Sequence, residues 1–383
     1  MQPVQTNEIY LDYAATTPVN PQVFDAYAQL VQSNFTNCDA LYAPAVNLKK
    51  IQEQARNKIA QMLGFKNEEI IFVSGASEAN NMIIKGFALT NKENSANKIL
   101  VSSVEHSSVK ESIAFVKEYY GTNVIEIPVS PEGLDMDFLR KHLDHSVGLV
   151  SIMAVNNETG MRFDIDRIAD LVRQNSHAKL HVDAVQAIGK ENIDFIHKVD
   201  ALTISMHKLH GMKGVGILAK RDNFAIPALI SAGQQEFGLR GGTSNACLNI
   251  TCAKTLRLAI ENQEQNRAHA KVLFDYAYNQ FVNDPLFHIN SSKEGSPFVF
   301  NVSSLTTTSQ VLMNALNAKG IYCSATSTCE SKQGASFVLK AMGFNEIVQT
   351  GSLRLSFSYE ISMEQLQKAI EIIKEVNQQY ATR

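Results

Sequence analysis

"IIFVSGASEANNMIIKG", residues 70–86, places a run of β-branched and aromatic residues before Gly-Ala-Ser and a helical pattern that opens with Glu78. The apolar run is typical of a buried strand, so the stretch predicts a strand, a short turn and a helix. Small residues at the start of such a helix can expose backbone N–H groups to an anion, usually phosphate. They also occur in plain strand–helix turns, so this stretch indicates a fold rather than a function.

The same alternation continues through residues 50–220. Amphipathic segments such as "DIDRIADLVRQNS", residues 164–176, separate the apolar runs. Strand–helix repetition is typical of an α/β fold with a mostly parallel central sheet and helices on both faces. Further strands are predicted in "KILVSSVEH" (98–106), "NVIEIPV" (123–129), "GLVSIMAV" (148–155), "KLHVDAV" (179–185), "ALTIS" (201–205) and "GVGILAK" (214–220).

A chain of 383 residues exceeds the usual size of a single hydrophobic core. We expect a large domain over 18–260 and a smaller α+β domain over 261–383, completed by 1–17. The polar stretch "ENQEQNRAHAK", 261–271, looks like the exit from the first unit. Beyond it come strands in "SPFVFNVSS" and "GSLRLSFS", and a last helix that Ser362 and Gln365 start with a capping box.

Composition excludes several classes of protein. The balance of 35 basic and 38 acidic residues gives no general attraction to nucleic acid or to anionic membranes. No apolar run approaches the roughly 20 residues that span a bilayer, and the N-terminus lacks a signal-peptide pattern. Five irregularly spaced cysteines do not suggest a disulfide framework, so we expect a cytoplasmic protein. Cys247 and Cys252 are read as helix packing, and no metal site is expected.

Polar side chains gather where the predicted strands end. His106 closes "SSVEH", Asn156 follows the run at 148–155, and Asp183 lies in "HVDAVQ" with Gln186 one turn later. Lys208 follows the next strand, in "SMHKLHGMKGVG". In open α/β sheets ligands bind at the carboxyl ends of the strands. Each residue alone is more commonly structural, whereas the ordered set indicates a ligand site.

This combination of residues suits pyridoxal 5'-phosphate. Lys208 can form a Schiff base with the aldehyde, while a buried carboxylate such as Asp183 keeps the pyridine nitrogen protonated. Ser205 and His207 can donate to the phosphate. An imidazole can stack on the ring, and the glycines at 211, 214 and 216 let the backbone turn away after Lys208.

Eight motifs carry a resemblance that runs almost from end to end. "YLDYAATTP", "FVSGASEANNMIIKG", "VEHSSV", "VNNETG", "HVDAVQ", "SMHKLHGMKGVG", "LRGGT" and "GSLRLSFS" appear in the order found in cysteine desulfurases of the NifS/IscS type. The chain resembles this family of fold-type I, pyridoxal phosphate-dependent enzymes. The resemblance implies a homodimer with the cofactor at the boundary of domains and subunits.

The resemblance also implies roles for individual residues. Lys208 would be the Schiff-base lysine, His106 would stack on the ring and help to transfer protons, and Gln186 would bond the ring hydroxyl. Asn156 and Arg354 would bind the carboxylate of the substrate, L-cysteine; a guanidinium suits a planar anion with two oxygens. The remaining cofactor contacts would come from Asp183 to the pyridine nitrogen and from Gly75, Ala76, Ser77, Ser205, His207 and the other subunit's Thr243 to the phosphate.

A thiol completes the implied reaction. Cys329, in "SATSTCES", stands where the family has its catalytic cysteine, and Cys323 is instead read as strand packing. The Cys329 thiolate would take the substrate sulfur as a persulfide, release L-alanine, and pass the sulfur to an acceptor protein. That acceptor would be an iron–sulfur scaffold or a tRNA- or cofactor-thiolation enzyme. No direct contact with nucleic acid or membrane is expected.

Other readings stay open. A related lyase or aminotransferase, including a selenocysteine lyase, would use the same cofactor site, and an aminotransferase would not need Cys329. A non-catalytic partner or sulfur-binding protein would keep the fold and lose the activity. The retained lysine, carboxylate, imidazole, guanidinium and thiol speak against the last reading.

Overall fold

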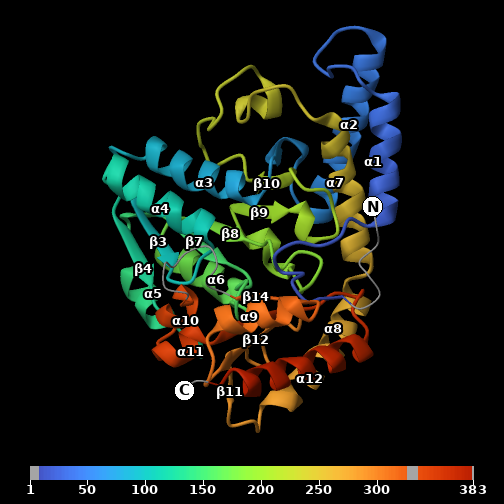
Figure 1. Cartoon of the computed structure of the whole chain (residues 1–383). Helices are drawn as coiled ribbons and strands as arrows, with labels where there is room; N and C mark the ends of the chain where they lie inside the picture. The colour runs from blue at the N-terminus through green and yellow to red at the C-terminus, as the bar shows by residue number, and fades with distance from the viewer. Residues whose placement is uncertain (1–7, 326–334, 382–383) are drawn as a thin grey trace.

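A seven-stranded sheet forms the centre of the molecule (Figure 1). The computed structural model describes residues 8–325 and 335–381. Four of the six strand pairings are parallel, and β10 runs antiparallel to both of its neighbours. The predicted α/β class with a mostly parallel sheet is confirmed. In spatial order the strands are β2 (Ile70–Val73), β10 (Gly216–Lys220), β9 (Ala201–Ser205), β8 (Lys179–Asp183), β7 (Val147–Met153), β3 (Lys98–Ser102) and β4 (Val124–Ile127).

Helices cover both faces of this sheet because its strands are apolar on both sides. In β2, Ile70 and Phe72 belong to one core and Ile71 and Val73 to another. The first core includes α2 (Ala43–Leu63), α6 (Ile165–Asn175) and α7 (Ala246–Glu261); the second includes α3 (Ala76–Thr90) and α4 (Ser107–Tyr120). The alternation follows from the two-residue period of a strand.

A separate antiparallel sheet organises the C-terminal part. Its strand order is β11 (Phe287–Ile289), β12 (Val299–Ser304), β15 (Ser352–Ser356) and β14 (Ser324–Ala325). Apolar faces of α8 (Gln263–Phe281), α9 (Ser309–Ala318) and α12 (Met363–Gln379) pack with it into a further core. The predicted capping box at Ser362 and Gln365 is present at the start of α12.

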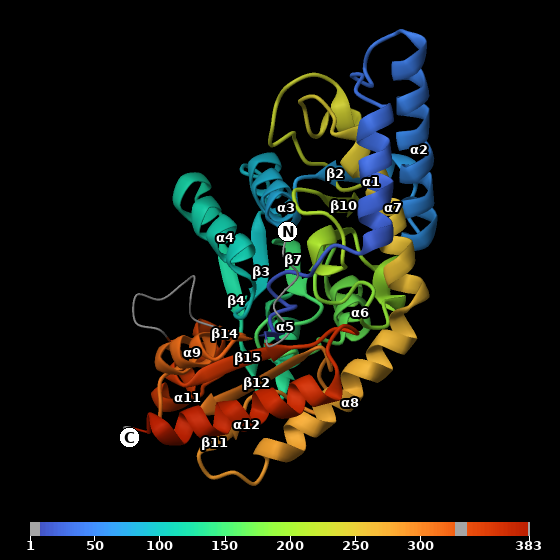
Figure 2. The same ribbon diagram turned by 45° about the vertical axis from the view of Figure 1, so that its right-hand side comes forward.

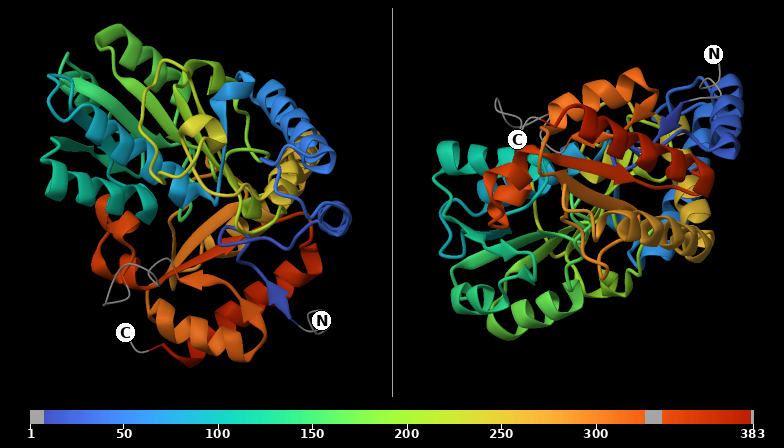
Figure 3. Two further views of the ribbon diagram at one scale, coloured as in Figure 1. Left: turned by 90° about the horizontal axis from the view of Figure 1, so that it is seen from above. Right: turned by 60° about the horizontal axis from the view of Figure 1, so that its bottom comes forward.

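The N-terminal segment joins this C-terminal part. β1 (Ile9–Tyr10) pairs in parallel with β13 (Ile321–Tyr322), and Leu11 and Tyr13 belong to the same core. Figure 3 shows the N-terminal segment, in blue, against the orange and red C-terminal part. The remaining elements are α1 (Pro21–Ser33), β5 (Val129–Ser130), β6 (Gly133–Leu134), α5 (Met136–His142), α10 (Phe337–Ala341) and α11 (Glu346–Thr350). Within the described ranges, we find no helix with the length and apolarity to cross a membrane.

The structure of residues 261–271 differs from the polar exit that the sequence predicted. They leave the central unit, but as helix: α7 ends at Glu261 and α8 begins at Gln263, so only Asn262 interrupts them (Figure 2). The two helices run along one side of the molecule. The boundary between the predicted large domain, which ends at residue 260, and the smaller domain, which begins at residue 261, stays a prediction. Cys247 and Cys252 are both buried in α7, as the sequence suggested.

Candidate active site

The turn after β2 begins one wall of the site. Strand β2 ends at Val73, and α3 starts at Ala76 with Gly75 as its N-cap, so no cap side chain satisfies the first backbone N–H groups of that helix. Strand β10 passes against this turn. A Cβ on Gly216 would lie 2.8 Å from Gly75 Cα and 2.7 Å from the carbonyl oxygen of Ile204, so only glycine allows this approach.

The predicted Schiff-base lysine stands on the loop between β9 and β10. A short 3-10 turn, Met206–Lys208, follows β9, and Gly214, at φ +79°, turns the chain back into β10. Lys208 Nζ donates to the carbonyl oxygens of Ala14 and Ala15, both at 2.6 Å. Burial and the nearby Arg354 lower the pKa of Lys208 to about 8. The amine is therefore more easily deprotonated than an exposed lysine.

Asp183 is a buried carboxylate at the end of β8, only 6% exposed. Its oxygens accept hydrogen bonds from Asn80 Nδ2 at 2.8 Å and from the backbone N–H of Val185 at 3.0 Å. Among the described residues, no basic side-chain nitrogen lies within 4.0 Å of it. A buried carboxylate without a cation is costly, so Asp183 suits a positively charged ligand group.

Gln186 follows Asp183 and is held from two sides. Its Nε2 donates to the carbonyl oxygen of Ala14 at 3.0 Å, and its Oε1 accepts from Lys190 Nζ at 2.7 Å. The N-terminal segment at Ala14 is therefore bonded both to Gln186 and to Lys208. This shared carbonyl holds the two predicted cofactor residues on one wall.

Two histidines border the site in different ways. His106 is the N-cap of α4, and its Nδ1 accepts from the backbone N–H of Ser108 at 3.1 Å. His207 Nδ1 lies 3.1 Å from Thr16 Oγ1. Burial and the charge of Lys208 lower the pKa of His207 to about 4, so this imidazole is neutral near pH 7.

Arg354 reaches the site from β15. Its Nη2 donates to Asp12 Oδ1 at 2.9 Å, and its Nη1 donates to the carbonyl oxygen of Asn157 at 2.9 Å. Its Nε is buried, and no group in residues 8–325 and 335–381 forms a hydrogen bond with it. The same Asp12 oxygen accepts from Ser324 Oγ at 2.8 Å. The guanidinium is thus oriented from two sides before any ligand binds.

These side chains surround one cavity of about 630 Å³. It brings together ten of the predicted site residues: Gly75, Ala76, Ser77, His106, Asp183, Gln186, Ser205, His207, Lys208 and Arg354.

Three predicted residues are not among those that line this cavity. Asn156 is buried behind the wall, where its Oδ1 accepts from the backbone N–H groups of Glu158 and Thr159, and Asn157 lines the cavity instead. Thr243 lines a smaller pocket with Ser74. Cys329 lies outside the described residues.

Sequence reasoning missed several residues of the site. Asp12 belongs to a quoted motif, but its pairing with Arg354 joins positions 342 residues apart, which no local pattern can reveal. Asn80 had a weak signal, since it lies one turn into the helix that the phosphate turn opens. In the part of the chain that the structure describes, no three His, Cys, Asp or Glu side chains gather as a metal site would need.

Comparison with known families agrees with this arrangement. Residues 9–369 match the family described as Aminotransferase class-V. "Cysteine desulfurase IscS" of Methanosarcina thermophila is 34% identical over 383 residues, which cover 98% of this chain and 93% of that protein. A "NifS/IcsS protein homolog" of Lactobacillus delbrueckii subsp. bulgaricus is 32% identical over 379 residues, 97% of this chain and 98% of the other.

Solved structures give the same result. A "NIFS-LIKE PROTEIN" superposes with a TM-score of 0.91 at 31% identity, covering 97% of this chain and 99% of the other. "SspA in complex with cysteine" superposes with a TM-score of 0.79 at 30% identity, covering 91% of this chain and 99% of the other. The family match, these relatives and the shared fold show that the chain belongs to the class-V aminotransferases, among the cysteine desulfurases of the NifS/IscS type.

Proposed function

We propose that this protein is a pyridoxal phosphate-dependent cysteine desulfurase that converts L-cysteine to L-alanine and retains the sulfur as a persulfide. One observation carries the proposal. A single cavity holds the amine of Lys208, the buried carboxylate of Asp183 and the guanidinium of Arg354. Among the described residues, Lys208 has no carboxylate partner and Asp183 has no cation partner. The family membership supports the same reaction, because its relatives are named as cysteine desulfurases.

The residues fit the cofactor. Asp183 lacks a cation among the described residues, and a protonated pyridine nitrogen would supply one. Within the described part of the chain, the hydrogen bonds of Lys208 Nζ go to carbonyl oxygens, and its pKa is lowered, so its amine suits capture of an aldehyde. The uncapped start of α3 at Gly75 suits a phosphate.

We assign the cofactor contacts by position. Lys208 would hold the aldehyde, Asp183 the pyridine nitrogen, Gln186 the ring hydroxyl, and His106 would lie on the ring face. When bound, the cofactor supplies an electron sink that stabilises negative charge on the substrate's carbon atoms. The phosphate would be held by Gly75, Ala76, Ser77, Ser205, His207 and, from the other subunit, Thr243.

The chain's own groups would then act on L-cysteine. Arg354 Nε and Nη groups bind the substrate carboxylate, and Lys208 Nζ takes the proton from the substrate α-carbon. Asn157 borders this position, while Asn156 keeps the turn in shape through its bonds to Glu158 and Thr159.

Cys329 would accept the sulfur. Its thiolate attacks the substrate sulfur, so an S–S bond forms and the substrate C–S bond breaks. The electron pair of the C–S bond stays with the substrate β-carbon, which takes up a proton. A proton also returns to the α-carbon, and the product leaves as L-alanine. The outer sulfur then passes from Cys329 to a thiol of the acceptor.

The assembly and partners belong to the same proposal. We infer a homodimer, as the family resemblance implies. Thr243 does not line the main cavity of its own chain but a smaller pocket that adjoins it at Ser74 and Gly214, and it would serve the other subunit's phosphate. The acceptor would be an iron–sulfur scaffold protein or a thiolation enzyme. A cytoplasmic location, where thiols stay reduced, suits a reaction that depends on a free thiol.

A single turnover tests the function. The purified holoenzyme is mixed with L-cysteine without reductant or acceptor, and alanine and the mass of the peptide containing Cys329 are measured. We expect one alanine per active site and the gain of one sulfur atom on that peptide. Alanine without added sulfur on Cys329 would contradict the persulfide mechanism.

Cys323→Ala is the matched control for Cys329→Ala. Cys323 packs on the C-terminal core, and burial raises the pKa of its thiol to about 12, so its thiolate is rare near pH 7. We expect Cys323→Ala to keep the turnover and Cys329→Ala to lose persulfide formation. Unchanged turnover in Cys329→Ala, or a keto acid product, would favour a lyase or an aminotransferase.

A further inference from the structure

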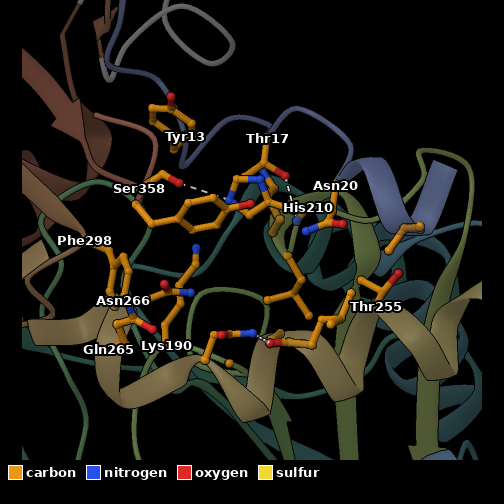
Figure 4. A pocket seen from close by; sticks show the side chains of 18 of the residues that line it. Tyr13, Thr17, Asn20, Lys190, His210, Thr255, Gln265, Asn266, Phe298 and Ser358 are labelled. Carbon is orange, nitrogen blue, oxygen red and sulfur yellow. Dashed lines mark hydrogen bonds between the residues drawn. The ribbon is translucent and has the colours of Figure 1, made fainter. Parts of the chain in front are cut away.

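A second cavity, of about 430 Å³, borders the first at Lys208. Figure 4 shows this second cavity from close by. The segment from Tyr13 to Val23 forms one side, the junction of α7 and α8 another, and Ser358 with Tyr359 a third. Lys208 lines both cavities, so a single side chain separates them at that point. Nothing in the proposed reaction uses this second space.

The polar groups on its wall favour an anion. None of the described residues that line it is an aspartate or glutamate. They include Lys190 and several amide side chains, among them Asn20, Gln265 and Asn266. Amide N–H groups and an ammonium can all donate to a carboxylate. Figure 4 shows Lys190 pointing into the space between Phe298 and His210.

Lys190 lacks a counter-ion in the described structure. The side chain is half-buried, and its Nζ donates to Gln186 Oε1 at 2.7 Å. Among the described residues, no carboxylate oxygen lies within 4.0 Å of this nitrogen. An enclosed ammonium without a carboxylate is unfavourable, and a bound anion would remove that cost.

Apolar side chains complete the wall and limit the kind of anion. The buried side chains of Leu209, Phe298 and Phe357 line the same space, so the carbon atoms of a small ligand can pack against them. We propose that this cavity binds a small organic carboxylate, with Lys190 as its counter-ion and the amides of α8 as further donors. This site is separate from the cofactor cavity, and its existence does not depend on the proposed desulfurase reaction.

The site is linked to the cofactor cavity through hydrogen bonds. Lys190 bonds Gln186, Gln186 bonds the carbonyl oxygen of Ala14, and Lys208 bonds that same oxygen. A carboxylate that draws the ammonium toward itself competes with Gln186 for its hydrogens. Occupancy of the second cavity therefore acts on residues that would hold the cofactor.

Binding should also be coupled to protonation. Burial and repulsion by Lys208 and Arg354 lower the pKa of Lys190 to about 7, while Glu191 opposes this shift. The other titratable groups here are Tyr13, Tyr359 and His210, with Glu360 lying 3.8 Å from His210. Burial and Lys190 lower the pKa of His210 to about 4, so it adds no charge near pH 7. Affinity should therefore fall on the order of 10-fold between pH 6 and pH 8.5.

Calorimetric titration of the purified holoenzyme tests the proposal. Sodium butyrate is the probe, and butyramide, which has the same shape without the charge, is its control. We expect butyrate to bind and butyramide to bind at least 10-fold more weakly. Lys190→Met should lower the affinity for butyrate at least 10-fold. Lys319→Met, which breaks an exposed pair with Glu375, should leave that affinity unchanged.

Arg354→Gln distinguishes this site from the cofactor cavity, where a carboxylate could also bind. The proposal expects Arg354→Gln to keep butyrate binding. It is overturned if Arg354→Gln abolishes binding, if Lys190→Met binds as tightly as the parent protein, or if butyramide binds equally well. Should Lys190→Met fail to fold, Asn266→Leu on α8 serves instead, with an expected loss of at least 5-fold.

Discussion

Arg354 Nη2 lies 2.9 Å from Asp12 Oδ1, so the guanidinium that would bind the substrate carboxylate is already paired with a carboxylate from the N-terminal segment. Both side chains are largely buried, at 9% and 19% exposure. The pair orients Arg354 and also partly neutralises it. A substrate carboxylate must therefore share the guanidinium with Asp12.

Asp12→Asn separates these two effects. The amide keeps an oxygen for Arg354 and Ser324 but removes the charge. We expect the free energy of unfolding to fall by about 1–3 kcal/mol, because a charged hydrogen bond is lost. The KM for L-cysteine should fall, since the guanidinium is no longer neutralised, and kcat should change less. Denaturant unfolding measures the change in stability, and steady-state kinetics measures the changes in KM and kcat.

Asp137→Asn is the matched control for this variant. Asp137 pairs with Arg140 on the surface, where both side chains are more than half exposed. Such a pair contributes little, so stability and KM should stay within error of the parent protein. An Asp12→Asn enzyme with a raised KM would show that orientation, and not charge, is the contribution of Asp12.

Capture of the cofactor by the apoprotein should depend on pH near 8. Burial lowers the pKa of Lys208 to about 8, and only the neutral amine attacks an aldehyde. The rate of covalent binding should rise up to about pH 8 and then level off. With an ordinary lysine, the rate would continue to rise until the pH reached the higher pKa of that lysine. Stopped-flow absorbance of added cofactor measures this rate. A rate still climbing well above pH 9 would contradict the lowered pKa.

Glu105 gives a prediction for stability. It is fully buried, and burial raises its pKa to about 8, although Ser102 and the backbone N–H of Met153 oppose this by donating to Oε1. Because the folded state holds this proton more tightly than the unfolded state, Glu105 loses its contribution to stability as pH rises from its unfolded pKa toward 8.

Glu105→Gln should remove that dependence. The amide oxygen can accept both hydrogen bonds, and the amide nitrogen replaces an oxygen that has no partner among the described residues. The free energy of unfolding of the variant, relative to that of the parent protein, should rise by about 2–4 kcal/mol as the pH rises from 5 to 8. Denaturant unfolding at the two values measures the gain, with the exposed Glu111→Gln as control. Parallel stability curves for Glu105→Gln and the parent would refute the raised pKa.

Thr243 tests the dimer by mixing two inactive variants. Lys208→Ala loses the amine, and Thr243→Asp should repel the phosphate at the site that it serves. If Thr243 acts on the other subunit, a mixed dimer of the two variants contains one intact site. We expect purified mixed dimers, obtained by co-expression, to turn over cysteine at about half the rate of the parent dimer, by simple counting of sites. Continued inactivity of purified mixed dimers would place Thr243 at its own chain's site.

The sequence was sufficient for the central sheet because each of its strands is a short apolar run followed by a turn or a helix. It was also sufficient to predict that Lys208, Asp183 and His106 lie around one cavity, because strand ends meet at one edge of such a sheet. It did not predict that Asn157, and not Asn156, lines the cavity, because the geometry of the turn decides which side chain faces it.

Two further differences have other causes. The stretch at 261–271 was read as a polar exit, yet it is helix, because a helix exposed along most of its surface has the composition of a linker. The pairing of Asp12 with Arg354 depends on how the two ends of the chain meet. No periodicity within one segment contains that information.

The parallel pairing of β1 with β13 has a consequence for the order of folding. Ile9 leaves the ribosome more than 300 residues before its strand partner, Ile321, so the first segment made is among the last to be fixed. That segment supplies Asp12 and the carbonyl oxygens that bind Lys208. During synthesis the central sheet can form early, but the cofactor site stays incomplete until nearly the whole chain has emerged.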